Sequence, residues 1–261
     1  EIGVRLVGSE MCIRDRGIDF FYGGNWDAFP KGAVRGMFVP YDDYIDLDSD
    51  LWKDVKAAND AMVWNDKHYM AIVEVTGDQC AIIYNRKTMD ENGLDDPAEL
   101  FEKGKWDWDA FMDMMKTFVS NAKDGETRYG INGWFGQAMV QSTGETFVKY
   151  DGSKFSNNIS NPAIEEAEGV MEEIMSLGLY DPTWYGYLPD DGSTLFFGMA
   201  DWALGASNVK ADPNPDYEDD GFVEENDLMI VPFPKQPGSD EYYLNCNFCL
   251  LYTSPSPRDG L

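Results

Sequence analysis

The stretch Gly93-Leu-Asp-Asp-Pro-Ala-Glu-Leu-Phe-Glu-Lys-Gly-Lys-Trp-Asp-Trp-Asp-Ala-Phe111 decides the fold, because it joins the end of one helix to the start of the next. Gly93 is a stop for two helical turns over 87–92, since glycine readily adopts the left-handed conformation that ends a helix. Asp107 stands where an N-cap belongs. The residues after it predict a helix over 107–122, whose apolar side chains recur at helical spacing: Trp108, Phe111, Met112, Met115, Phe118 and Val119.

Short β-rich runs flank this stretch on both sides and predict strands. In chain order they are 17–22, 67–75, 79–85, 129–135 and 227–234, and the fourth opens into a loop at Trp134 and Phe135. Further helices are predicted near 49–59, over 161–178 and over 194–200. The second of these has Asn161 as its cap and Pro162 in its first turn. Strands that alternate with helices indicate an α/β architecture.

Composition bounds the function. A chain of 261 residues suffices for one large domain or two lobes, and 43% hydrophobic content indicates a packed protein. A formal charge of −28 excludes unaided binding to nucleic acid or to an anionic membrane, because both need a basic surface. His68 is the single histidine, which excludes histidine triads and multi-histidine zinc sites. We therefore expect no metal and no cofactor.

The two ends of the chain resemble translated transposase-adapter DNA from sequencing libraries. Residues 1–16 and 249–261 can be encoded by one DNA sequence read on opposite strands. We expect residues 249–261 to pair with no preceding helix or strand. Each end carries equal numbers of acidic and basic residues, so the charge of −28 belongs to 17–248. We expect this core to be a fragment open at both ends. Its cysteines are then Cys80 and Cys246.

The order of motifs along the core resembles the extracellular solute-binding proteins of bacterial ABC importers, family 1. The segments that carry the resemblance are Gly17-Ile-Asp-Phe-Phe-Tyr22, Lys67-His-Tyr-Met-Ala-Ile72, Ile82-Ile-Tyr-Asn-Arg86, the stretch 93–111, Phe197-Gly-Met-Ala-Asp-Trp-Ala-Leu-Gly205 and Ile230-Val-Pro-Phe-Pro-Lys235. The chain departs from the family pattern at several places. Asp66 replaces a glycine, Val73 a proline and Asp107 a capping threonine.

The resemblance implies an α/β, two-lobed periplasmic-binding-protein-like (type II) fold, truncated at both ends. We expect a partial N-terminal lobe over 17–73 and a C-terminal lobe over 74–228. Hinge crossings are expected near 71–77 and 227–233. The segment 229–248 is expected to return into the N-terminal lobe.

The resemblance also implies a function. Such a protein captures a carbohydrate, here an oligosaccharide, between its lobes and delivers it to the permease of an ABC importer. It works outside the cytoplasm, in the periplasm or as a cell-surface lipoprotein. Its only membrane tether is then an N-terminal lipid anchor, which this chain lacks.

A sugar presents hydroxyls and apolar C–H faces, so its binder needs aromatic planes together with carboxylates or amides. In α/β sheets such groups belong in loops beyond strand ends. On this basis the predicted ligand residues are Asn25, Trp26, Asp27, Glu74, Trp134, Phe135, Ser207 and Asn208. Two of these residues also have a structural interpretation that competes with ligand binding. Trp26 would then pack under its loop, and Glu74 would be a solvated charge at a strand end. Where related proteins often carry a stacking tryptophan, this chain has Ser207 and Asn208.

Two other classes of protein remain open. The acidic loop 212–227 spaces its carboxylates partly like an EF-hand, but Pro213 and Pro215 preclude an entering helix. A solvated loop is the alternative. The chain has no G-x-S-x-G, Walker or G-x-G-x-x-G motif, so we expect no enzyme. The alternatives are a secreted carbohydrate-active hydrolase and a calcium-dependent cell-surface binding protein.

Overall fold

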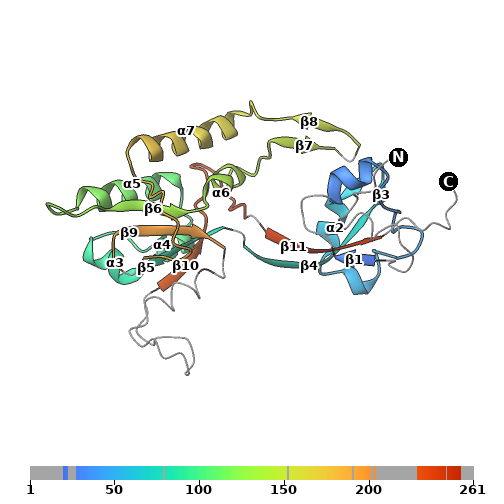
Figure 1. Ribbon diagram of the computed structural model, residues 1–261, viewed down its shortest axis with the longest axis horizontal. Coiled ribbons are helices and arrows are strands. Elements are labelled where there is room, and N and C mark those ends of the chain that lie inside the picture. The colour runs from blue at the N-terminus through green and yellow to red at the C-terminus, as the bar shows by residue number, and fades with distance from the viewer. Residues whose placement is uncertain are drawn as a thin grey trace, which may run out of the picture. The chain divides into compact units, whose positions relative to one another are not determined.

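The structure is a computed structural model that describes residues 20–22, 28–78, 80–151, 153–189, 191–200, 203, 228–244 and 246–253 (Figure 1). These residues divide into two compact units. Unit 1 takes its described residues from 1–76, 150–156 and 247–261, and unit 2 takes them from 77–149 and 157–246. Among the described residues, no helix has both the length and the apolar character needed to cross a membrane.

Unit 1 is built on a three-stranded sheet with the order β1 (Phe20–Tyr22), β11 (Cys246–Thr253), β4 (Met70–Asp78). β1 pairs antiparallel with β11, with Phe20 opposite Thr253. Successive residues of β4 alternate between two small cores, as the period of two in a strand requires. Met70 and Ile72 pack with Phe38, and Ala71 packs with Tyr41 and Leu47.

Short elements complete the main part of unit 1. They are the turns η1 (Ala28–Gly32) and η2 (Asp50–Trp52), the helix α2 (Lys56–Ala61), and the strands β2 (Val63–Trp64) and β3 (Lys67–His68). The hairpin β2–β3 turns through Asn65 and Asp66, which have φ of 48° and 59°. Two consecutive residues with positive φ in a two-residue loop match the twist of the paired strands. Aspartate tolerates this conformation, which accounts for Asp66 where related sequences have glycine.

A hairpin from later in the chain joins unit 1. Its strands are β7 (Val148–Tyr150) and β8 (Phe155–Asn157), and residues 150–156 belong to unit 1. The Phe155 ring stacks on both Trp64 and Tyr150, with centroids 5.5 and 4.6 Å away. The Tyr150 hydroxyl donates to the carbonyl of Val63. Sequence analysis did not anticipate this excursion.

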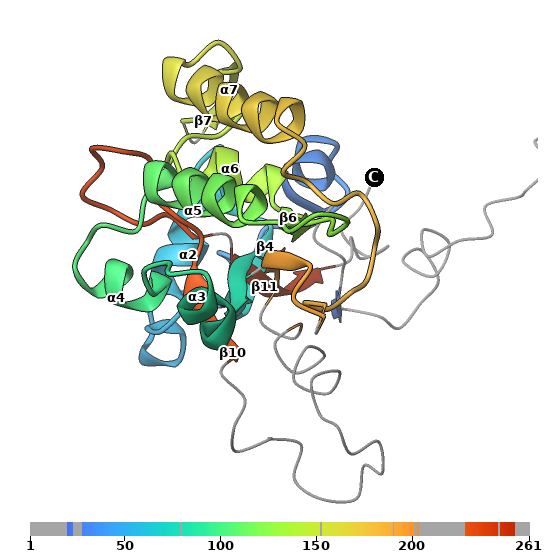
Figure 2. The same cartoon turned by 90° about the vertical axis from the view of Figure 1, so that its left-hand side faces the viewer.

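Unit 2 is a four-stranded sheet with helices against it. The strand order is β10 (Leu228–Pro232), β5 (Ala81–Asn85), β9 (Thr194–Met199), β6 (Tyr129–Gly133). β5 pairs antiparallel with β10 and β9, whereas β9 and β6 are parallel. The helices are α3 (Arg86–Glu91), α4 (Pro97–Glu102), α5 (Trp108–Ser120), α6 (Gly136–Gln141) and α7 (Pro162–Ser176). In Figure 2, α5, α6 and α7 lie together on one side of this sheet.

The predicted helix starts of unit 2 are confirmed. Asp107 Oδ1 accepts from the Ala110 N–H at 3.0 Å and caps α5, and Asn161 caps α7 in the same manner. Trp106 and Trp108, at the start of α5, are fully buried. Their indole N–H groups donate to the Pro232 carbonyl at 2.8 Å and the Ser142 hydroxyl at 3.0 Å. Buried indoles need such partners, so these tryptophans are structural.

Three expectations were wrong. Residues 194–199 form the strand β9 and not a helix, because all six are buried between neighbouring strands and carry no alternation that sequence could reveal. The segment 229–248 was expected to return into the first lobe, but its described residues up to Cys246 belong to unit 2, where β10 pairs with β5 along its whole length. The C-terminal segment does pair with a preceding element, since Leu251–Thr253 lie opposite Tyr22–Phe20.

Candidate ligand-binding site

The site begins where the parallel strands β6 and β9 end. Gly133, the last residue of β6, has φ of +99°, and a Cβ there would meet the Gly198 carbonyl oxygen at 2.3 Å. Only glycine fits this close approach. The next residue, Trp134, donates its backbone N–H to the same Gly198 oxygen at 2.8 Å. The chain therefore leaves the sheet at Gly133 with the Trp134 side chain directed outward, 69% exposed.

A second exposed tryptophan stacks on the first. Trp184 is 52% exposed, and its ring centroid lies 5.0 Å from that of Trp134 with 27° between the planes. Its loop is fixed to the edge of β6, because the Asp181 N–H donates to the Ile131 carbonyl at 2.9 Å. The pair, called here the indole platform, offers apolar aromatic surface to solvent.

Asn132 ties the loop of Trp184 to β6. Its Nδ2 donates to the carbonyls of Asp181 at 3.0 Å and Thr183 at 2.5 Å. The Asp181 carboxylate accepts from the Thr183 N–H at 2.9 Å and shapes the turn. Asn132 is buried, and within the described part of the chain its Oδ1 has no hydrogen-bond partner. The platform thus rests on a buried amide that keeps one acceptor unused.

Two hollows adjoin Trp134, and both are lined by Gly133, Trp134 and Tyr180. The first has a volume of about 430 Å³, and its further lining residues are Cys80, Phe135, Gly136, Gln137, Ala138, Met171 and Met175. The second has a volume of about 360 Å³, and its further lining residues are Asn132, Pro182, Thr183 and Trp184. The second hollow combines indole surface with amide and carbonyl groups, which is the chemistry that a polyhydroxylated ligand requires.

The predicted ligand residues fall into three groups. Trp134 belongs to the platform, whereas its neighbour Phe135 is 4% exposed and packs edge-on against Tyr180 beside the first hollow. Glu74 is exposed on β4 of unit 1. The others, Asn25, Trp26, Asp27, Ser207 and Asn208, lie outside the described residues, as does the acidic loop 212–227.

Sequence analysis missed Trp184 and Asn132. The signal for Trp184 is the run Asp181-Pro-Thr-Trp184 directly after the helix stop Gly178, a turn that no apolar periodicity includes. For Asn132 the only local signal is an amide inside an otherwise apolar strand, Gly130-Ile-Asn-Gly133. A polar side chain in such a position needs a reason beyond packing.

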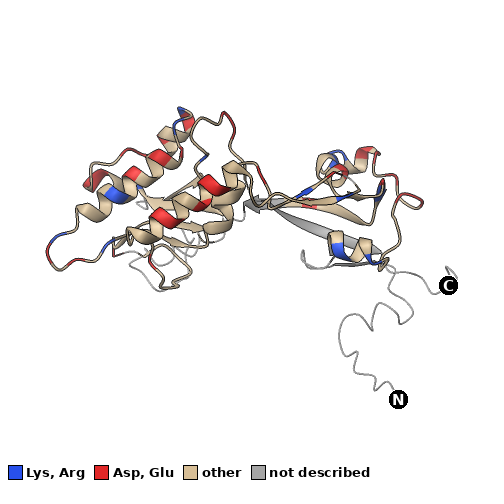
Figure 3. Cartoon of the chain, turned by 90° about the horizontal axis from the view of Figure 1, so that it is seen from above, with Lys and Arg blue, Asp and Glu red and all other residues tan. Residues whose placement is uncertain are grey.

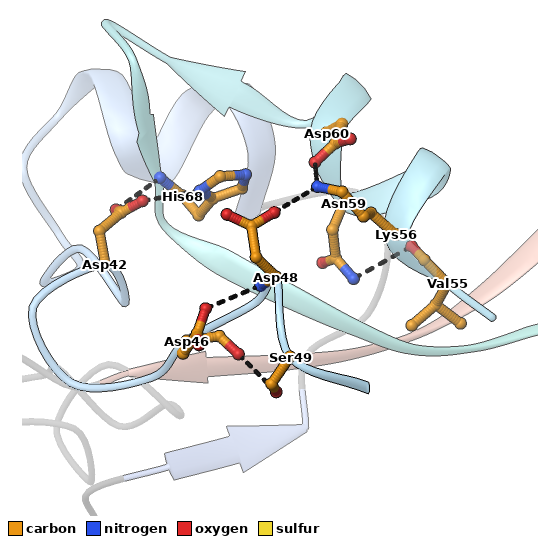
Figure 4. A network of polar contacts seen from close by, with 9 residues as sticks. All are labelled: Asp42, Asp46, Asp48, Ser49, Val55, Lys56, Asn59, Asp60 and His68. Atoms are coloured by element: carbon orange, nitrogen blue, oxygen red, sulfur yellow. Dashed lines mark hydrogen bonds and ion pairs between the residues drawn. The ribbon is translucent and has the colours of Figure 1, made fainter. Parts of the chain in front are cut away.

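Unit 1 carries a separate polar network around α2 and β3 (Figure 4). His68 Nδ1 lies 2.7 Å from Asp42 Oδ1, and the His68 N–H donates to Asp42 Oδ2 at 2.9 Å. Burial raises the pKa of Asp42, but the bonds from His68 outweigh it, and the net pKa is lowered. Lys56 Nζ contacts Asp48 at 2.5 Å and Asp60 at 2.9 Å. Within the described residues, no cluster of three or more His, Cys, Asp or Glu side chains is arranged to hold a metal ion.

Solved structures share this fold. The sugar-binding protein MalE from the phytopathogen Xanthomonas citri superposes with a TM-score of 0.65 at 14% identity, over 92% of this chain and 58% of that chain. A sugar transporter from Rhizobium etli in an open conformation gives 0.63 at 14% identity over the same shares. A Listeria monocytogenes ABC substrate-binding protein in complex with cycloalternan gives 0.59 at 16% identity, again over 92% and 58%. No curated protein sequence matches.

These likenesses confirm the predicted fold class, an α/β two-lobed periplasmic-binding-protein fold. The chain spans about 58% of the length of its first structural neighbours. The family model described as bacterial extracellular solute-binding protein matches residues 14–247. The chain therefore belongs to the bacterial extracellular solute-binding protein family.

Proposed function

We propose that this protein is an extracytoplasmic receptor that captures a carbohydrate and delivers it to an ABC import permease. The observation that carries the proposal is the indole platform of Trp134 and Trp184 at the strand ends of unit 2. Sugar rings present C–H faces that stack on indoles, and exposing two tryptophans to water without a ligand to cover them is unfavourable.

The ligand is proposed to be neutral. Acidic residues are spread over both units in Figure 3, and the whole chain has a net charge of −28. This field repels anionic solutes such as uronates and phosphates. The ligands named for four similar structures are cycloalternan, maltotetraose, β-1,6-galactobiose and D-mannitol, which are neutral and polyhydroxylated. An oligosaccharide of this kind suits a platform wide enough for two indoles.

The finer parts of the proposal rest on family membership. They are capture between two lobes, delivery to the permease, and tethering outside the cytoplasm through an N-terminal lipid anchor. Ligand contacts that stabilise one arrangement of the lobes increase the fraction of molecules in that arrangement. Periplasmic binding proteins close over their ligands in this way. The lobe limits 17–73 and 74–228 stay predictions.

Substitution of Trp134 tests the proposal. Isothermal titration with maltotetraose, cycloalternan and β-1,6-galactobiose should show binding by the unaltered chain, and Trp134→Ala should weaken it ten-fold or more, or about 1.4 kcal/mol. Phe147→Ala, which removes another exposed ring of unit 2, is the matched control and should leave the affinity unchanged. Equal affinities in the Trp134 variant and the control would overturn the site.

The same samples separate a receptor from a hydrolase. A receptor binds the saccharide stoichiometrically and returns it intact, whereas a carbohydrate-active hydrolase releases shorter products. Chromatography of each saccharide after prolonged incubation with the protein distinguishes the two. We expect the saccharide to be recovered intact, and release of reducing ends by the unaltered protein but not by the Trp134 variant would establish the hydrolase instead.

A further inference from the structure

We infer that Asn132 binds the ligand through its Oδ1 and so requires a hydrogen-bond donor, a free hydroxyl, next to the sugar face that lies on the indole platform. This inference rests on the proposed function and adds to it the group that the ligand must present. It concerns the second hollow, which Asn132 lines together with Trp134 and Trp184.

The orientation of the Asn132 amide is fixed by its neighbours. The Asp181 and Thr183 oxygens that it contacts belong to backbone carbonyls, which can only accept. Both contacts therefore require the NH₂ group of Asn132, and exchanging the amide nitrogen and oxygen would bring oxygen against oxygen twice. The Oδ1 assignment follows from this network.

Among the residues that the structure describes, the remaining acceptor has no partner. Asn132 is 1% exposed, and its Oδ1 is buried without a hydrogen bond. Buried polar atoms are normally satisfied, so an unpartnered amide oxygen on a residue that lines a ligand-sized hollow indicates a bond completed by a ligand. A hydroxyl can supply the missing donor. A carboxylate, an ether oxygen or a fluorine cannot, because each only accepts.

A second buried asparagine shows the complete pattern. Asn59 of unit 1 is also 1% exposed, and its Nδ2 also donates to two carbonyls, those of Val55 and Ile72, at 3.2 and 3.0 Å. Its Oδ1, however, accepts from the Ile72 N–H at 2.7 Å. The fold thus completes a purely structural asparagine with three bonds and leaves Asn132 with two.

The experiment compares hydroxyl with fluorine on the ligand. Among maltotetraose, cycloalternan, β-1,6-galactobiose and D-mannitol, the tightest ligand of the full 261-residue chain is titrated next to its series of monodeoxyfluoro derivatives. Fluorine is close in size to a hydroxyl but donates no hydrogen bond. We expect one derivative to bind at least ten-fold more weakly than the parent ligand.

Two variants assign that loss to Asn132. Asn132→Leu has no acceptor and should bind the parent ligand and the sensitive derivative equally. Asn132→Ala also lacks the acceptor and is smaller than leucine, so it should give the same result and serves if the leucine variant does not fold. Asn59→Leu is the control: it should lower the unfolding temperature and leave the hydroxyl preference unchanged.

The outcomes distinguish the inference from the proposed function. If a saccharide binds and Trp134→Ala weakens it, but every fluorinated derivative binds as well as the parent, the inference is overturned and the proposed function stands. A hydroxyl preference that persists in Asn132→Leu also overturns the inference. Absence of any saccharide binding overturns both.

Discussion

The two units use stacked aromatic rings in opposite ways. In unit 1, Phe155 lies within stacking distance of Trp64 and Tyr150, and the three half-buried rings cover one another. Among the described rings of unit 2, Trp134 and Trp184 stack only with each other, and they remain mostly exposed. The first arrangement uses ring surface to fasten a hairpin, whereas the second keeps ring surface available. An aromatic cluster therefore points to ligand binding only where its faces are left open.

The largest effect should come from the glycine that positions the platform. Gly133→Ala places a Cβ at 2.3 Å from the Gly198 oxygen and forces a residue with a side chain to adopt φ of +99°. We expect unit 2 to lose about 3 kcal/mol of stability, measured by urea unfolding, together with saccharide binding. Gly169→Ala, in the interior of α7 with open space around it, is the matched control. It should stabilise the protein by about 0.5–1 kcal/mol.

The closed stack of unit 1 should respond in stability and not in binding. Phe155→Ala removes a half-buried ring from contact with Trp64 and Tyr150, and we expect a loss of about 2 kcal/mol, below the range for a fully buried phenylalanine. Chemical denaturation followed by tryptophan fluorescence reports it. Saccharide affinity, measured under conditions where the variant remains folded, should stay within two-fold. A ten-fold loss of affinity would contradict the division between closed and open stacks.

The open pair should respond in binding and not in stability. Trp184→Ala removes an indole that is 52% exposed, so little buried surface is lost and the unfolding temperature should change by only about 1 °C. Saccharide affinity should fall about ten-fold, which corresponds to about 1.4 kcal/mol. Titration calorimetry and thermal unfolding of one sample measure both. A destabilised variant with unaltered affinity would show that the pair is a packing device like the stack in unit 1.

Local signals in the sequence predicted what local chemistry determines. Asp107 and Asn161 cap their helices through the neighbouring backbone, within three residues, so their positions could be inferred from spacing alone. Strand β9 was misassigned because a central strand buried on both faces has no alternation, and a short apolar run is equally compatible with a helix.

The candidate site was only half predictable for a related reason. Trp134 follows a predicted strand directly, and loops at strand ends are where α/β sheets bind ligands. The role of Asn132 depends on carbonyls 49 and 51 residues later, and that of Trp184 on its stacking with Trp134 across the fold. Contacts between such distant positions leave no pattern in a single sequence.

Two hydrogen-bonded carboxylates, the partly buried Asp96 of unit 2 and the exposed Asp42 of unit 1, extend the comparison of the units to acid pH, with the smallest expected effect. Burial raises the pKa of Asp96 in unit 2, but bonds from the Tyr84 hydroxyl, the Ala98 N–H and Arg86 outweigh it and lower the net pKa. The Arg86 Nε lies 2.6 Å from Asp96 Oδ2. In unit 1 the corresponding bonds to Asp42 come from the side chain and backbone of His68 and from the backbone of Asp42 itself, with no arginine among them.

A lowered carboxyl pKa stabilises the folded state above the unfolded-state value of 3.8, and that stability is lost as the pH falls through the lower folded value. We therefore expect Asp96→Asn to cost about 1 kcal/mol at pH 7 and progressively less as the pH falls below 3.8, in urea unfolding measured from pH 7 to acid pH. Tyr84→Phe removes one of the three hydrogen-bond donors to Asp96. It should therefore lower the pH-dependent part of the unfolding free energy by less than Asp96→Asn does. Asp96 contacts an arginine that stays charged over this whole pH range, so its contribution to the unfolding free energy should exceed that of Asp42. Asp42→Asn, measured in the same way, tests this. Equal pH dependence in the two asparagine variants would show that the bonds from Arg86 and Tyr84 add nothing beyond what the His68 contacts supply.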